Sequence, residues 1–217
     1  GASFHHNLLA HHSSRTPRLD GSRSIGRWEE ELTDLRNNVF YNWGPTNGGY
    51  AGEGGRYNFV NNYYKPGPAT PKNSPVRYRI AAIGVRTKKY CTNADGTSNA
   101  WKPMEHVWGK LYVDGNIIEG NEEVTQDNWT KGIYGQINNA SCDNTFTKNV
   151  KKKMRLSEPL DAGIITTHSA KQAYELVLDQ AGCSRQRDAI DIRVIEETRN
   201  GTATYIGSVT KGAESVP

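Results

Sequence analysis

The chain has 217 residues, of which 35% are hydrophobic and 22 are glycine, and its formal net charge is +4. This apolar share is low for one compact sandwich and suits a solenoid, which has a narrow core and many polar turns. No apolar run approaches the ~18 residues of a membrane span, which argues against a membrane protein. The positive charge favours an anionic partner without choosing among nucleic acid, an anionic membrane and an acidic polysaccharide.

A degenerate repeat runs through the first half of the chain. Four segments share the order apolar or aromatic, polar, asparagine, then two large β-formers: FHHNLL at 4–9, LRNNVF at 35–40, FVNNYY at 59–64 and YVDGNII at 112–118. Their asparagines Asn7, Asn38, Asn62 and Asn116 are 31, 24 and 54 residues apart, which suits one or two coils of a β-helix per step. We expect stacked strands with these asparagines hydrogen-bonded into a ladder. The alternative is that each asparagine marks an unrelated hairpin turn.

Residues 66–106 separate the third and fourth of these segments. They contain five of the nine prolines and many small polar residues, which are typical of turns and loops. We expect an excursion from the coil stack with one strand, from Arg77 to Val85. Residues 121–157 look irregular, and the run Lys151–Lys153 is expected to be a solvated surface.

Two helices are expected near the C-terminus. Ser169 and Gln172 have the spacing of a capping box, and apolar residues follow at helical intervals. A second helix is expected from about Asp188 to Asn200 because Gly201 follows as a helix stop. These helices, over about 169–200, are expected to cap an open end of the coil stack, which is a structural role.

The segment from Phe4 to Arg18, FHHNLLAHHSSRTPR, contains the pattern HHN followed eight residues later by Arg-x-Pro. It resembles the motif of the family 1 polysaccharide lyases, the pectate lyases, with Asn7, Arg15 and Pro17 at the matching positions. Further stretches resemble the same family, and they lie at 34–44, 52–70, 111–121 and 187–202. A lone HHN would be weak, whereas the ordered set is specific. The resemblance implies an all-β fold, a right-handed parallel β-helix with C-terminal helices, of which residues 1–217 form the C-terminal part.

The same resemblance implies a secreted enzyme that cleaves polygalacturonate by calcium-dependent β-elimination. Elimination removes the proton at C5 of a uronate, so negative charge builds next to a carboxylate and cations must neutralise it. Arg15 stands at the position of the family's catalytic arginine, and we expect it to be the base. Arginine side chains are rarely neutral, but neighbouring cations favour the neutral form. The alternative is that Arg15 only stabilises the developing charge.

Other arginines are candidates for binding the acidic substrate. The family often has a second arginine five residues beyond the first, where this chain has Asp20. Arg18 is the nearest substitute for binding a substrate carboxylate. Arg23, Arg27 and Arg56 are expected to line a basic groove, and the alternative for Arg56 is an ion pair with Glu53.

Calcium ligands are expected outside this chain. Near Arg15 the only acidic residues are Asp20 and Glu29–Glu31, which do not form the oxygen-rich set that Ca²⁺ requires. Family members place their acidic ligands on coils upstream of the HHN motif, so we expect Ca²⁺ to be held by an upstream segment of the same enzyme. Because the chain opens with a strand pattern, we also expect that segment to cover the exposed strand edges.

A zinc site is one interpretation of the four histidines near the N-terminus, which are His5, His6, His11 and His12. Alternation along a strand would send the members of each pair to opposite faces, and no cysteine lies nearby to complete a zinc set. Turn and stacking roles are therefore favoured. A disulfide between Cys91 and Cys142 stays open from the sequence alone.

The sequence is compatible with three functions. The first is a lyase acting on demethylated pectin, with polygalacturonate rather than nucleic acid or a membrane as its partner. The second is a pectin lyase for methyl-esterified substrate, which the abundance of arginine and lysine disfavours. The third is a non-catalytic β-helix that binds acidic glycans, which the Arg15-x-Pro17 motif disfavours.

Overall fold

The computed structural model describes residues 1–21, 31–44, 48–135 and 145–206. Its strands form three parallel four-stranded sheets. The first sheet contains β1 (Ala2–His5), β4 (Leu32–Arg36), β7 (Arg56–Val60) and β10 (Lys110–Asp114). The second contains β2 (Leu8–Ala10), β5 (Val39–Tyr41), β8 (Tyr63–Lys65) and β11 (Ile117–Ile118). The third contains β3 (Arg18–Leu19), β6 (Tyr50–Ala51), β9 (Ala81–Ile83) and β12 (Ile133–Gly135).

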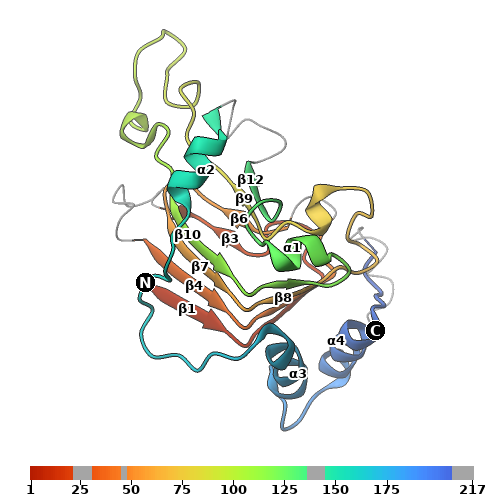
Figure 1. Ribbon diagram of the computed structural model, residues 1–217. Helices are drawn as coiled ribbons and strands as arrows, with labels where there is room; N and C mark the ends of the chain where they lie inside the picture. Colours follow the sequence, from red (N-terminus) through yellow and green to blue (C-terminus); the bar gives the residue numbers. More distant parts are fainter. Residues whose placement is uncertain (22–30, 45–47, 136–144, 207–217) are drawn as a thin grey trace.

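Consecutive strands belong to different sheets, so the chain passes through all three before it returns to the first sheet one level further along (Figure 1). Each strand pairs in register with its counterpart in the next coil, about 4.8 Å away. The stacked parallel sheets are compatible with the parallel β-helix expected from the sequence. The fold is not plainly all-β, because the described residues also form helices α1 to α4. The right-handed sense of the coils stays a prediction.

Apolar side chains fill the interior between the three sheets. One row runs through the first sheet, where Leu35 pairs with Phe59 and Phe59 with Val113. In the second sheet, the rings of Phe40 and Tyr64 stack with centroids 4.7 Å apart. These five side chains are buried, and burying a large apolar side chain contributes about 1.5–3 kcal/mol to stability. The narrow core explains how a chain of low apolar content can fold.

The predicted asparagine ladder is confirmed. The side-chain Nδ2 of Asn7 donates to Asn38 Oδ1 at 2.9 Å, and Asn38 donates in the same way to Asn62 at 3.1 Å. Asn62 donates to Asn116 Oδ1 at 2.9 Å, and Asn116 donates to Asn128 Oδ1 at 3.0 Å. The ladder therefore has one more member than the sequence indicated.

The bend itself is made by the residue before each ladder asparagine. His6, Asn37 and Asn61 have φ of 55°, 55° and 51°, which is the left-handed region. The ladder asparagines themselves do not have a positive φ. Their amides point into the coil instead, where each one hydrogen-bonds to its neighbours.

The far end of the core is closed by two short helices. Val124 of α1 (Glu122–Gln126), Trp129 and Met154 of α2 (Lys148–Met154) are buried in the same apolar cluster as the strands. The prediction that 121–157 is irregular was therefore wrong. Lys151 is not simply solvated either, because its Nζ donates to the carbonyls of Thr130 and Ile133.

Helices α3 (Ala170–Gln180) and α4 (Ala189–Asn200) follow the predicted positions, and the capping box of Ser169 is formed. They lie beside the second sheet and do not cap an end of the stack (Figure 1). The outward side chains Val39 and Tyr41 of β5 are apolar and fully buried, which explains why this face needs a cover. No helix among the described residues is long and apolar enough to cross a membrane.

The predicted excursion is shorter than expected. Strand β9 (Ala81–Ile83) belongs to the third sheet, and a 3₁₀ turn at Pro75–Arg77 precedes it. The loop that leaves the stack is residues 84–107, between β9 and β10, and it contains a second 3₁₀ turn at Lys102–Met104. Cys91 in this loop is a buried free thiol, so it forms no disulfide. Cys142 lies outside the described residues.

The interior is accessible at the β1–β2–β3 end. Phe4 is 51% exposed although its pairing partner Leu35 is buried. A cavity of about 560 Å³ opens there, lined by Phe4, Leu9 and Leu19 with Arg18 and Asp20 beside them. The upstream segment expected to cover this end stays a prediction.

Candidate functional site

Arg15 lies in the connection between β2 and β3 and is exposed. Its φ is +54°, and among the described residues the other non-glycine residues with positive φ are all asparagine or histidine, which tolerate that region better. The chain on both sides is anchored, because Gly44 N donates to His12 O at 3.0 Å and Thr16 N donates to Gly48 O at 3.3 Å. A conformation that costs about 1 kcal/mol or more persists where the surroundings impose it, often at functional sites.

Arg18 follows on β3, and its side chain is 47% exposed. Its neighbour Leu19 points into the core, so Arg18 points away from it. One cross-strand row leads from Arg18 to Tyr50, Ala82 and Tyr134 on the outer side of the third sheet. Asp20 lies 3.9 Å from Arg18, and an exposed pair at that distance adds little stability.

The other predicted substrate-binding arginines are not on this sheet. Arg56 begins β7 and pairs with Leu32 and Lys110 in the first sheet. The structure thus places Arg18 and Arg56 on two different sheets and does not combine them into one row. Arg23 and Arg27 lie outside the described residues. Arg15 lies in the connection that leads into β3, and Arg18 is the first residue of that strand.

The outer face of the first sheet is occupied by a strap, residues 160–168. Asn58 Nδ2 donates to Leu160 O, and Leu160 N donates to Asn58 Oδ1, both at 2.9 Å. Arg36 Nη1 donates to Thr167 Oγ1 at 2.9 Å. Helices α3 and α4 lie beside the second sheet, and the strap lies on the first. The outer row that begins with the exposed Arg18 is on the third sheet.

A hydrogen-bonded chain of three histidines joins the strap to the coils. His5 Nδ1 lies 3.0 Å from His6 Nδ1, and His6 Nε2 lies 3.0 Å from His168 Nδ1. Burial lowers the pKa of His6, and the neighbouring His5 and His168 lower it further. The expectation that His5 and His6 point to opposite faces was wrong, because the positive φ of His6 ends the strand alternation.

His11 joins β2 to α4. Its Nδ1 lies 2.9 Å from Asn42 Nδ2, and its Nε2 lies 3.0 Å from Glu197 Oε2. Asn42 Oδ1 already accepts from Ala69 N, and Asn42 Nδ2 also donates to Tyr205 O. This fixes the amide orientation, so His11 Nδ1 accepts a hydrogen bond. Burial lowers the pKa of His11, and Glu197 opposes that shift only in part.

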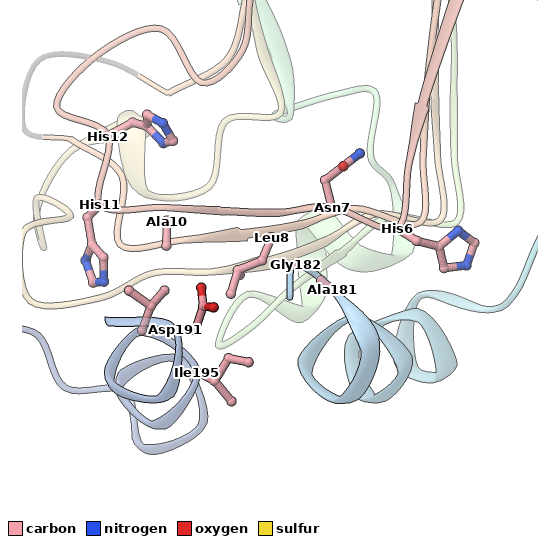
Figure 2. Close-up of a pocket in the computed structure, with 11 residues that line it drawn as sticks. His6, Asn7, Leu8, Ala10, His11, His12, Ala181, Gly182, Asp191 and Ile195 are labelled. Atoms are coloured by element: carbon pink, nitrogen blue, oxygen red, sulfur yellow. The ribbon is translucent and has the colours of Figure 1, made fainter. Parts of the chain in front are cut away.

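Between these histidine contacts, a cavity of about 410 Å³ lies between β2 and the helices α3 and α4 (Figure 2). Figure 2 shows His11 pointing toward the helices and His12 away from them. Both follow the end of β2, and His11 has a φ of +63°, so strand alternation is not the cause. Both ring nitrogens of His6 lie 3.0 Å from nitrogens of other histidines. His11 Nδ1 lies 2.9 Å from Asn42 Nδ2, whereas its buried Nε2 lies 3.0 Å from Glu197 without hydrogen-bond geometry. His6 therefore links the coils to the strap, and His11 links them to α4. Both have the positive φ of a turn and make T-shaped ring contacts, which agrees with the turn and stacking roles expected for them.

The described residues contain no group of three or more histidine, cysteine, aspartate or glutamate side chains that could hold a metal ion. Ca²⁺ takes six to eight oxygen ligands, and the described side chains do not fit that requirement.

Comparison with known proteins gives two informative matches. The chain is 34% identical over 103 residues to a protein of Aspergillus terreus named probable pectate lyase C, which covers 46% of this chain and 22% of that protein. It is 24% identical over 205 residues to a protein of the same name from Aspergillus flavus, which covers 92% of this chain and 37% of that protein. The chain is similar to proteins named pectate lyase. No family model matches it.

The similarity with the Aspergillus flavus protein extends over nearly all of this chain. The chain spans well under half the length of either probable pectate lyase. Sequence reasoning did not find His168 or Glu197 as partners of the motif histidines. His6 and His168 are 162 residues apart, and no local pattern marks such a contact.

Proposed function

We propose that this chain is part of a secreted pectate lyase that cleaves α-1,4-linked polygalacturonate by β-elimination. The observation that carries the proposal is Arg15, exposed on an anchored turn with a positive φ. It stands at the arginine position of the motif that begins at Phe4. The similarity to proteins named probable pectate lyase C supports the same activity.

The proposed roles follow from the charge of the substrate. Arg18 binds a uronate carboxylate through its planar fork of N–H donors. Arg15 removes the C5 proton, the C4–O4 bond breaks, and a C4=C5 double bond forms in the product. The departing O4 takes a proton from solvent. Positive charge at the site stabilises the carbanion-like transition state, in which negative charge spreads onto the carboxylate.

Calcium and secretion are parts of the proposal as well. Ca²⁺ would supply further positive charge and orient the uronate ring, held by ligands on an upstream segment. That segment would also pair with the open edges of β1, β2 and β3, which lie at the ends of their sheets.

The test is a lyase assay on polygalacturonate that follows the ultraviolet absorbance of the unsaturated product. We expect product formation that a calcium chelator abolishes and that added Ca²⁺ restores. Faster turnover of methyl-esterified pectin would instead indicate a pectin lyase. Tight binding of polygalacturonate without any unsaturated product, in the presence of Ca²⁺ and of the upstream segment, would indicate a non-catalytic glycan-binding protein.

A further inference from the structure

The loop of residues 84–107 holds a buried arginine between two aromatic rings. The guanidinium carbon of Arg86 lies 4.0 Å from the ring centroid of Tyr90 and 4.3 Å from that of Trp101. Arg86 is 3% exposed, whereas Tyr90 is 45% exposed. The guanidinium is thus held beneath an aromatic surface that solvent can reach. We call these three residues the aromatic bracket.

The charge of Arg86 is not neutralised by an ion pair among the described residues. Its Nε and Nη2 are buried without a hydrogen-bond partner. Glu105, which is paired with Arg86 in a β-bridge, forms its ion pair with Lys102 at 2.7 Å. A buried guanidinium without a carboxylate is uncommon, and the two ring faces supply only part of the missing stabilisation.

The loop itself is well tied together, so the bracket is pre-formed. Asn99 N donates to Cys91 O at 3.1 Å, and Cys91 Sγ lies 3.3 Å from Trp101 O. Asn99 Nδ2 donates to Tyr90 O at 2.8 Å, and Trp101 N donates to Asn99 Oδ1 at 2.9 Å. Both aromatic residues therefore have fixed backbones, and a ligand would not have to order them.

We propose that the aromatic bracket is an accessory binding site for an acidic saccharide. An exposed aromatic ring offers a flat apolar surface to the C–H face of a pyranose. The uronate carboxylate then meets the exposed ammonium groups of Lys88 and Lys89. Arg86 is buried, so it attracts the carboxylate through its positive charge beneath the ring and not by direct contact. Residues 84–107 contain four lysines and arginines against two acidic residues, so the loop carries a positive charge.

This inference rests on the proposed function for the identity of the saccharide. The position of the loop supports an accessory site near the proposed substrate site. Arg86 follows β9 closely, and β9 lies two strands from β3 in the third sheet. Strand β3 carries Arg18. Two strand spacings amount to about 10 Å. A polymer bound at Arg18 and running along the coil axis would therefore reach the strand from which the loop departs.

The experiment measures binding of an oligogalacturonide of fixed length to the full chain by isothermal titration calorimetry. We expect Tyr90→Ala to weaken binding about tenfold, as loss of one stacking ring does elsewhere. Tyr90→Phe should keep the wild-type affinity. Ile164→Ala, a fully exposed apolar residue on the strap, is the matched control and should also bind as the wild type does. Trp101→Ala removes the second ring of the aromatic bracket, and its affinity for the oligogalacturonide is measured in the same way. Melting curves show that each variant is folded.

Two further ligands test the chemical class. An uncharged galactan oligomer should bind at least tenfold more weakly if Arg86 and the lysines attract carboxylates. A single-stranded oligonucleotide of equal charge that binds more tightly than the oligogalacturonide would overturn the saccharide assignment. Equal affinity of Tyr90→Ala and the wild type would overturn the accessory site alone. Absence of oligogalacturonide binding by the wild type would overturn this inference, whereas the lyase assay tests the proposed function separately.

Discussion

Asn38 and Asn62 lie one coil apart, and the Nδ2 of Asn38 donates a 3.1 Å hydrogen bond to the Oδ1 of Asn62. The same Oδ1 also accepts from the backbone N of Asn38 at 3.0 Å. Asn62 Nδ2 in turn donates to Leu35 O and to Asn116 Oδ1. One buried amide thus satisfies polar groups on both neighbouring coils.

Replacing Asn62 by alanine should therefore destabilise the whole stack. The change leaves buried donors on Asn38 and a buried acceptor on Leu35 without partners, so we expect the free energy of unfolding to fall by about 3 kcal/mol. Urea denaturation measures it. Asn73→Ala, at an exposed turn position, should change stability by less than about 0.5 kcal/mol. A loss no larger than that of the control would contradict the structural role of the ladder.

Arg15 and Arg18 should affect different kinetic parameters of the proposed reaction. Arg15→Ala and Arg15→Lys should both lower kcat by about 100-fold or more, because lysine lacks the planar fork and the position of the base. Arg18→Ala should mainly raise KM. Initial rates on polygalacturonate decide this, with exposed Lys72→Ala as the control. Near-normal turnover of Arg15→Lys would show that Arg15 is not the base.

Stability should decrease in mild acid. The pKa values of His6, His11 and His12 are lowered from 6.5, chiefly by burial, so the unfolded chain takes up protons first as pH falls. The contribution of these residues is complete above pH 6.5 and is lost progressively below it. We expect the urea midpoint to fall between about pH 7.5 and pH 5.

His11→Asn should flatten this pH dependence. Asparagine tolerates the positive φ at this position and does not titrate. Of the charged groups around His11, Glu197 favours its protonation, while Arg193 and His12 oppose it. The comparison is between the slopes of the unfolding free energy against pH in the variant and in the wild type. Identical slopes would exclude His11 as a source of the effect.

Lys65 should hold the helical pair α3–α4 against the coils. Its Nζ donates to Arg199 O at 3.0 Å and to Tyr174 OH at 3.2 Å, and it lies 3.7 Å from Glu119. Lys65→Met removes a charged donor from the C-terminal carbonyls of α4. We expect faster amide hydrogen exchange in both helices, equivalent to about 1–2 kcal/mol, with the ladder strands unaffected.

The matched variant for that experiment is Lys171→Met, because Lys171 is exposed on α3 and should leave exchange unchanged. Uniformly faster exchange throughout the coils after Lys65→Met would mean that the helices are not a separately stabilised unit. Unchanged exchange in α3 and α4 would mean that Lys65 does not hold them.

The repeat in the sequence was sufficient to predict the stacked coils and four members of the ladder. Residues such as Asn38 and Asn62 carry this information locally, because each stands between two β-forming segments at a similar place in its coil. The capping box of Ser169 and the helix stop at Gly201 were predictable for the same reason. They are formed by residues within one turn of one another.

Contacts between distant segments were decided by the tertiary structure. Asn128 joins the ladder only because α1 folds back over the end of the core, and α3 lies beside the coils because Val39 and Tyr41 present an apolar outer face. The separation of Arg18 from Arg56 likewise depends on which sheet each strand enters. Local patterns determine where strands, turns and caps form, whereas side-chain partners far apart in the chain are set by how those elements pack.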